Sequence, residues 1–144
     1  MIGIGQFGIV IAALGAVLTL MGLFPSVTGI QTSPGVGVMQ FVSILIGLAL
    51  LNMGALLYVR YTLYANRATN LTQQIGVRLT LTGLVLAGLT GLADFLGFGS
   101  HARVGGGDVF FGQLQALGLV GSMLICALGV MIYAVTGNPP DDSG

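Results

Sequence analysis

The sequence predicts an all-α integral membrane protein, a four-helix (tetraspan) bundle. Four apolar stretches, residues 4–24, 39–59, 78–97 and 110–135, each approach the roughly 20 residues of helix that cross a hydrocarbon core about 30 Å thick. Charged residues make up only 6% of the 144 residues, and the mean hydropathy is +1.01. Soluble domains carry about a quarter charged residues. We therefore expect a single transmembrane domain over residues 1–144, with no extramembrane module.

The first stretch is expected to be a retained span. It follows no basic segment, and it is longer than the apolar core of a cleavable secretory signal. The connection after it, residues 25–38, is rich in proline and glycine and carries no charge, which indicates a compact turn. At the other end of the chain, residues 137–144 are expected to form a flexible polar tail.

The orientation follows from the arginines. Arg60, Arg67 and Arg78 flank the connection between the second and third stretches, and Tyr58 and Tyr61 lie beside Arg60 where an interfacial aromatic belt is expected. Short loops rich in arginine remain in the cytoplasm. With four spans, both termini then share that side. The sequence thus predicts an N-in, C-in protein, which we assign to the bacterial inner (cytoplasmic) membrane.

Each stretch carries one face of small side chains, spaced three or four residues apart. In lipid, small residues let helix backbones approach closely, so that dispersion and weak interhelical hydrogen bonds can act. We expect these faces to point inward and the bulky side chains to face lipid or a partner, so Gly47→Leu or Gly83→Leu should disrupt the bundle far more than Leu48→Ala. The residues assigned to helix packing are Gly8, Ala12, Gly15, Ser43, Gly47, Gly54, Gly83, Ala87, Gly118, Ser122 and Gly129.

The second and fourth stretches share one pattern, displaced by 75 residues from position 40 to position 115. The matching residues are Gln40, Ser43, Gly47, Leu51, Gly54 and Tyr58 in the second stretch and Gln115, Gly118, Ser122, Cys126, Gly129 and Tyr133 in the fourth. One interpretation is two tandem helical hairpins related by duplication, a parallel repeat. The other is chance recurrence, because the chain has 25 glycines.

A possible polar site comprises Asp94, Arg103 and Asn52. An ionisable residue in a span is a functional candidate by default, here for proton or cation handling. Asp94 lies near the outer end of the third stretch, however, where the simpler role is to pair with Arg103 or to accept hydrogen bonds from loop amides. Asn52 is the deepest polar side chain and needs a hydrogen-bond partner. We expect it to bond across to another helix, with contact to a substrate as the alternative.

Cofactor and metal sites are not expected within the chain itself. His101, the sole histidine, is a weak cofactor-binding candidate that would ligate a pigment or haem supplied by a partner. Cys126 is the sole cysteine, so the chain has no internal disulfide and no Cys–His metal spacing. No base accompanies a nucleophile, so enzymatic activity is not expected. The zero net charge and lack of a basic cluster exclude nucleic-acid binding of the usual kind.

These features favour a non-catalytic integral subunit of a larger energy-transducing complex, of the respiratory or photosynthetic electron-transfer class. Its partners would be other integral membrane subunits and lipid, and its role would be packing and the enclosure of lipid or quinone. The main alternative is a small homo-oligomeric channel or transporter for a neutral or small solute. A weaker alternative is an assembly or sensor protein that acts through its arginine-bearing loop.

Overall fold

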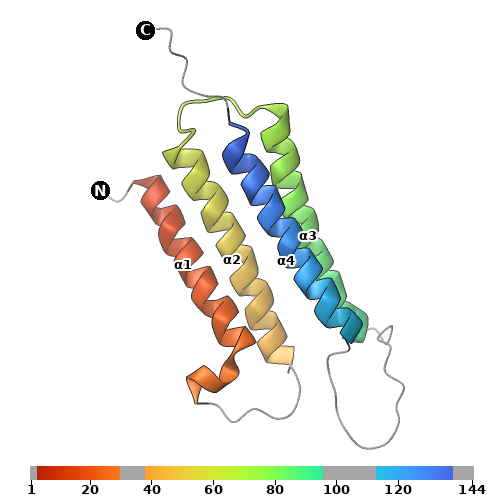
Figure 1. Cartoon of the computed structure of the whole chain (residues 1–144). Coiled ribbons are helices and arrows are strands. Elements are labelled where there is room, and N and C mark those ends of the chain that lie inside the picture. The colour runs from red at the N-terminus through yellow and green to blue at the C-terminus, as the bar shows by residue number, and fades with distance from the viewer. Residues whose placement is uncertain (1–2, 30–37, 96–112, 138–144) are drawn as a thin grey trace, which may run out of the picture.

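The computed structural model describes residues 3–29, 38–95 and 113–137, and in these ranges it is all-α (Figure 1). The helices are α1 (Ile4–Leu23), α2 (Val38–Thr62), α3 (Leu71–Phe95) and α4 (Gln113–Val135), with a short 3₁₀ turn, η1 (Pro25–Thr28), after α1. All four long helices have the length and apolar composition of membrane spans. The predicted fold class is therefore confirmed, and the composition identifies an integral membrane protein.

α3 begins at Leu71, well before residue 78, where the third apolar stretch was expected to start. Asn70 and Gln73 form a reciprocal cap at this end. The Gln73 backbone nitrogen donates to Asn70 Oδ1 at 2.8 Å, and the Asn70 backbone nitrogen donates to Gln73 Oε1 at 3.3 Å. These bonds satisfy two amide groups that a helix start otherwise leaves unpaired. The polar first turns of α3 therefore extend the helix beyond the apolar stretch.

The four helices form two hairpins that lie side by side. α1 packs along α2, α3 packs along α4, and α2 also contacts both α3 and α4 (Figure 1). α1 begins and α4 ends at the end of the molecule where the α2–α3 connection lies. Both ends of the helical domain are thus on the same side as Arg60 and Arg67, as four antiparallel spans require.

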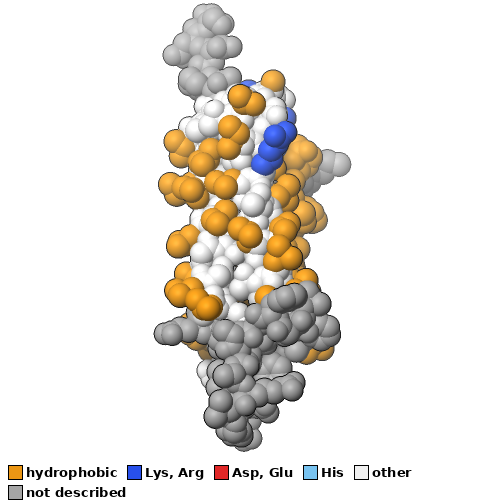
Figure 2. All heavy atoms as spheres, turned by 90° about the vertical axis from the view of Figure 1, so that its right-hand side faces the viewer, with side chains coloured by type: hydrophobic (Ala, Val, Ile, Leu, Met, Phe, Trp, Pro, Cys, Tyr) orange, Lys and Arg blue, Asp and Glu red, His pale blue; other side chains and the backbone are white. Residues whose placement is uncertain are grey.

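Large apolar side chains cover the outside of the hairpins. Examples are Phe7 and Leu14 on α1 and Leu117 and Leu124 on α4, each more than half exposed. Figure 2 shows such side chains along most of one face, with basic side chains gathered toward one end. In water, a surface of this kind would be unfavourable because burial of apolar area drives folding. In a bilayer it matches the solvent.

The two hairpins meet through a small core of larger side chains. Ile44 and Leu48 of α2 pack with Ala87 of α3 and Leu119 of α4, and all four are buried. The expectation that Leu48 would face lipid or a partner is wrong, since its side chain is 4% exposed. Successive residues on a helix point about 100° apart, so Leu48 faces the second hairpin while its neighbour Gly47 faces α1. α2 has two packed faces, whereas the small-residue pattern reveals only one.

Candidate functional site

The α1–α2 interface brings backbone directly against backbone. A Cβ added to Gly15 would lie 2.6 Å from the carbonyl oxygen of Gly47, and one added to Gly47 would lie 2.8 Å from the carbonyl oxygen of Gly15. Gly8 and Gly54 are related in the same way, at 2.9 and 2.6 Å from each other's carbonyl oxygens. Real Cβ atoms do not approach heavy atoms this closely, so these four positions need glycine at this helix separation.

The α3–α4 interface is built on the same plan. A Cβ on Gly76 would lie 2.7 Å from the carbonyl oxygen of Gly129, and the reciprocal distance is 2.6 Å. A Cβ on Gly83 would lie 3.0 Å from the carbonyl oxygen of Ser122. Close approach of this kind is what small residues provide in membrane helices. Ala87, farther along α3, is fully buried.

The two hairpins therefore repeat one set of contacts. The pairs Gly8–Gly54 and Gly15–Gly47 in the first correspond to Gly76–Gly129 and Gly83–Ser122 in the second. The first helix of each pair is displaced by 68 residues, from 8 to 76, and the second by 75, from 54 to 129. The recurrence in sequence thus coincides with a recurrence of interhelical contacts.

Gly76 is a packing residue that sequence reasoning missed, because it precedes the third apolar stretch. A usable signal was present. Gly76 lies seven residues before Gly83, the same spacing that separates Gly8 from Gly15. The other assigned residues lie near these contacts. A Cβ on Gly54 would lie 2.7 Å from the Cα of Ala12, a Cβ on Gly118 would lie 3.0 Å from Thr90 Oγ1, and Ser43 is partly buried one turn before Gly47.

Most polar side chains inside the helices bond to backbone carbonyl groups. Thr19 donates to Gly15 at 2.8 Å and Ser122 donates to Gly118 at 2.7 Å, each one turn back along its own helix. Thr80 donates to Gly76 at 3.0 Å. These bonds satisfy hydroxyl groups that lipid cannot satisfy. Their arrangement is that of packing residues rather than of a hydrated path.

Thr80 and Cys126 also make a reciprocal contact across the α3–α4 interface. Thr80 Oγ1 lies 3.5 Å from the carbonyl oxygen of Cys126, and Cys126 Sγ lies 3.5 Å from the carbonyl oxygen of Thr80. Cys126 is a free thiol, 1% exposed. It thus occupies the place of a small packing residue between the helices.

The α2–α3 connection caps the end of α4. Tyr64 donates its hydroxyl to the carbonyl oxygen of Ala134 at 2.6 Å, and Asn70 Nδ2 donates to that of Thr136 at 2.5 Å. Gln73 Nε2 reaches the carbonyl oxygen of Tyr133 at 3.4 Å. The last carbonyl groups of a helix have no partner within it. These side chains supply partners and fasten the connection to the second hairpin.

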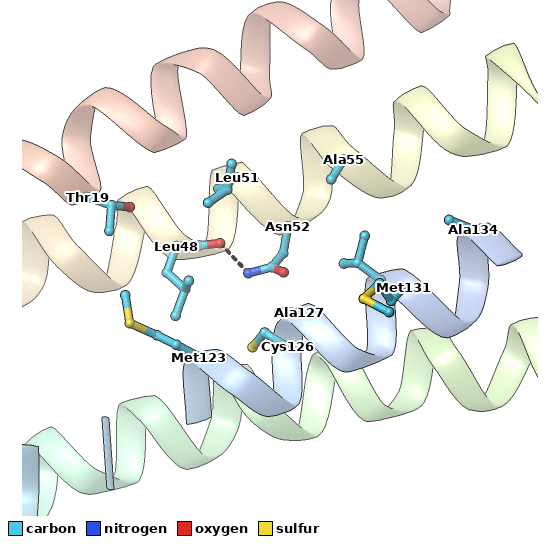
Figure 3. Close-up of a pocket in the computed structure, with 11 residues that line it drawn as sticks. Thr19, Leu48, Leu51, Asn52, Ala55, Met123, Cys126, Ala127, Met131 and Ala134 are labelled. Carbon is cyan, nitrogen blue, oxygen red and sulfur yellow. Dashed lines mark hydrogen bonds between the residues drawn. The ribbon is translucent and has the colours of Figure 1, made fainter. Parts of the chain in front are cut away.

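A groove of about 440 Å³ separates α2 from α4 (Figure 3). Its lining is almost wholly apolar, and α1 contributes only Thr19. The residues lining it are Thr19, Leu48, Leu51, Asn52, Ala55, Met123, Cys126, Ala127, Val130, Met131 and Ala134. It lies beside the core between the hairpins, where alanines on both helices leave space that larger side chains fill elsewhere.

Asn52 is the one amide among the described residues that lines this groove; the hydroxyl of Thr19, the other polar lining residue, is bonded to the Gly15 carbonyl group. Asn52 Nδ2 donates to the carbonyl oxygen of Leu48 at 2.7 Å, so the expected bond to another helix is not formed. The side chain is 6% exposed, and its carboxamide projects from α2 toward α4 (Figure 3). The α4 residues that line the groove are apolar apart from Cys126, whose thiol contacts the Thr80 carbonyl oxygen of α3. The carboxamide therefore bonds back to its own helix. Asn52 Oδ1 borders the groove, and within the described residues the bond from Nδ2 is the one that the carboxamide makes.

Other sequence-predicted site residues fall outside the described part. Asp94 is in the last turn of α3, but its side chain is not described, and neither Arg103 nor His101 is. The expected Asp94–Arg103 pair and the histidine candidate are therefore outside the described residues. In the ranges 3–29, 38–95 and 113–137, no group of three or more His, Cys, Asp or Glu side chains could hold a metal ion.

Comparisons of the chain with protein-family models, curated proteins and solved structures find no match.

Proposed function

We propose that this chain is a non-catalytic integral membrane subunit of a larger complex, of the energy-transducing, electron-transfer class. In that role it packs against other membrane helices and encloses lipid or quinone. The proposal places it in a bacterial inner membrane, with its arginine-bearing connection in the cytoplasm. The observation that carries it is the contrast between closely packed glycine faces inside each hairpin and bulky apolar side chains outside.

The outer surface supports the proposal. Each hairpin is closed by contacts that leave no room for insertion, so new partners can add only from outside. α1 offers the largest free surface because its packing is mainly with α2, and Leu14 and Val17 point away from that contact. An exposed apolar helix face such as that of α1 can pack against further membrane helices through dispersion.

The interior supports a non-catalytic role. Hydroxyl groups in the interior donate hydrogen bonds to backbone carbonyl groups of the same chain, as in Thr19, Thr80 and Ser122. Within the described spans, the side chains that face inward carry no charge. A proton or ion path needs ionisable or hydrated groups along the interior. The geometry therefore favours a packing subunit over a pump.

The proposal is tested by extracting the tagged full chain from its native membrane in a mild detergent and by native electrophoresis. A photo-crosslinking residue at Leu14 of α1, with a second variant carrying it at Leu124 of α4, reports what lies against each outer face. We expect a complex larger than any homo-oligomer, containing a stoichiometric partner crosslinked at a fixed site. We also expect a visible absorption band from a redox group held by that complex.

Two outcomes overturn the proposal. Migration as a monomer or homo-oligomer, with crosslinks only to lipid or to other copies, would exclude the subunit role. A complex without a redox absorption band would exclude the electron-transfer class. Solute flux through proteoliposomes of the purified chain, abolished by Asp94→Asn, would instead support the channel or transporter alternative.

A further inference from the structure

The groove between α2 and α4 has an unpaired hydrogen-bond acceptor in its wall. Asn52 Nδ2 donates to the Leu48 carbonyl group. Only the nitrogen of a carboxamide can donate a hydrogen bond, so this contact fixes the orientation of the carboxamide. Oδ1 is therefore the atom of the carboxamide that takes no part in this bond. The residue is 6% exposed, and its Oδ1 faces the groove rather than a donor among the described residues. An acceptor that is open only to an apolar groove is unfavourable without a donor, and bilayer lipid tails provide none.

We propose that this groove binds a lipid-soluble aromatic molecule that carries a hydroxyl group, of the phenol or hydroquinone class. The hydroxyl donates to Asn52 Oδ1, and the ring lies between α2 and α4. This site requires only the present chain, and it stands whether or not the chain has partner subunits.

The size and position of the groove favour such a ring. Its volume of about 440 Å³ falls within the roughly 300–1,000 Å³ typical of small-molecule sites. Asn52 is near the middle of α2, far from both helix ends, so a phospholipid headgroup would not reach it. An acyl chain could enter the groove but would leave Oδ1 without a donor. A compact ring with one hydroxyl satisfies both the apolar walls and the acceptor.

The sulfur-containing side chains favour an aromatic ring over an aliphatic alcohol. Met123 and Met131 line the groove from α4, about two turns apart on either side of Ala127 (Figure 3). Thioether sulfur makes favourable contacts with the edges of aromatic rings, and methionine adapts its shape to what it contacts. Ala55 and Ala127 keep the space between them open.

The test uses the purified full chain in lipid nanodiscs and two photoreactive probes. One is a phenol that carries a diazirine, and the other is the same diazirine compound without the hydroxyl. After irradiation, labelled positions are mapped by peptide mass spectrometry. We expect the phenol probe to label the groove residues of α4 saturably, with competition by 2-naphthol but not by naphthalene. The hydroxyl-free probe should label mainly the exposed faces.

Two variants test separately the hydrogen bond to Asn52 Oδ1 and the open volume of the groove. Asn52→Leu keeps the side-chain size and should reduce groove labelling by the phenol probe about tenfold, the effect of one good hydrogen bond in an apolar site. Ala55→Phe fills the groove and should abolish labelling there. Ala13→Phe, on the exposed face of α1, is the matched control and should change nothing. Helix content measured by circular dichroism verifies that each variant is folded.

The proposal is overturned if both probes label the groove equally, or if folded Asn52→Leu retains full labelling. Crosslinks that join the groove to a second copy of the chain would also overturn it, because the groove would then be an interface between copies. None of these three results depends on whether partner subunits are found in native membranes.

Discussion

Gly54 and Gly129 occupy equivalent places in the two hairpins. A Cβ on Gly54 would lie 2.6 Å from the carbonyl oxygen of Gly8, and a Cβ on Gly129 would lie 2.6 Å from the carbonyl oxygen of Gly76. Each glycine also lies against a small residue of the facing helix, Ala12 and Thr80 respectively. The same contact is thus made twice within one chain, and it sets how closely each pair of helices approaches.

We predict that Gly129→Ala destabilises the second hairpin by about 1–3 kcal/mol, the usual cost of overpacking a close interface. The added methyl group would press on the backbone of α3, which cannot yield without moving the helix. The matched control is Gly121→Ala on the same helix, where a Cβ would meet nothing within 4 Å. Unfolding in mixed micelles with increasing sodium dodecyl sulfate measures both variants. Equal stabilities for the two would contradict the assignment of Gly129 to the interface.

The helix interfaces could be predicted from the sequence because close contact between helix backbones requires glycine or other small residues at regular helical spacing. Gly8, Gly15, Gly47 and Gly54 were assigned to helix packing by spacing alone, and the structure places all four between α1 and α2. The spacing rule says nothing about large side chains. Leu48 was therefore assigned to the wrong environment, since the contact between hairpins depends on shape and leaves no periodic mark.

Asn52 shows a second limit of sequence reasoning. Its depth and its need for a partner were evident from the sequence, but the identity of the partner depends on which residues of α4 face it. The structure places mainly apolar residues there, and the amide bonds back to the Leu48 carbonyl group. The groove itself arises from the docking of two hairpins and has no sequence motif.

We predict that Leu48→Ala weakens the contact between the hairpins by about 2–5 kcal/mol, the range for truncating a buried leucine. The small-residue pattern places Leu48 on the outside and predicts a mild effect, whereas its burial predicts a substantial one. Leu117→Ala, at a position 65% exposed, is the control and should have little effect. The same detergent titration compares them. A mild effect at Leu48 and a large one at Leu117 would show that the hairpins do not dock as described.

We predict that Tyr64→Phe lowers stability by about 1 kcal/mol, because it removes the hydroxyl bond to the Ala134 carbonyl group. The ring contact with Tyr133, at 6.4 Å between centroids and 87° between planes, would remain. Hydrogen exchange of the amides at the end of α4 provides the local readout. Faster exchange there, with unchanged exchange in α1, is the expected result. A uniform change across all helices would point to a different cause.

We predict that a cysteine introduced at Ala68, in the exposed α2–α3 connection, reacts with a membrane-impermeant maleimide only from the cytoplasmic side. The arginines on either side of this connection determine that orientation. The unmodified chain is its own control, because Cys126 is buried and should not react. Labelling in intact cells but not in inverted vesicles would reverse the predicted topology.

The contacts inside each hairpin differ in kind from the contacts between the two hairpins. Each hairpin is held by backbone contacts too close to admit a Cβ, whereas the boundary between them consists of Ile44, Leu48, Ala87 and Leu119 beside an open groove. The boundary is therefore the place where the two helix pairs can shift relative to each other with the least loss of close backbone contact. A molecule bound in the groove would lie between α2 and α4 and would thereby set the angle between the two hairpins.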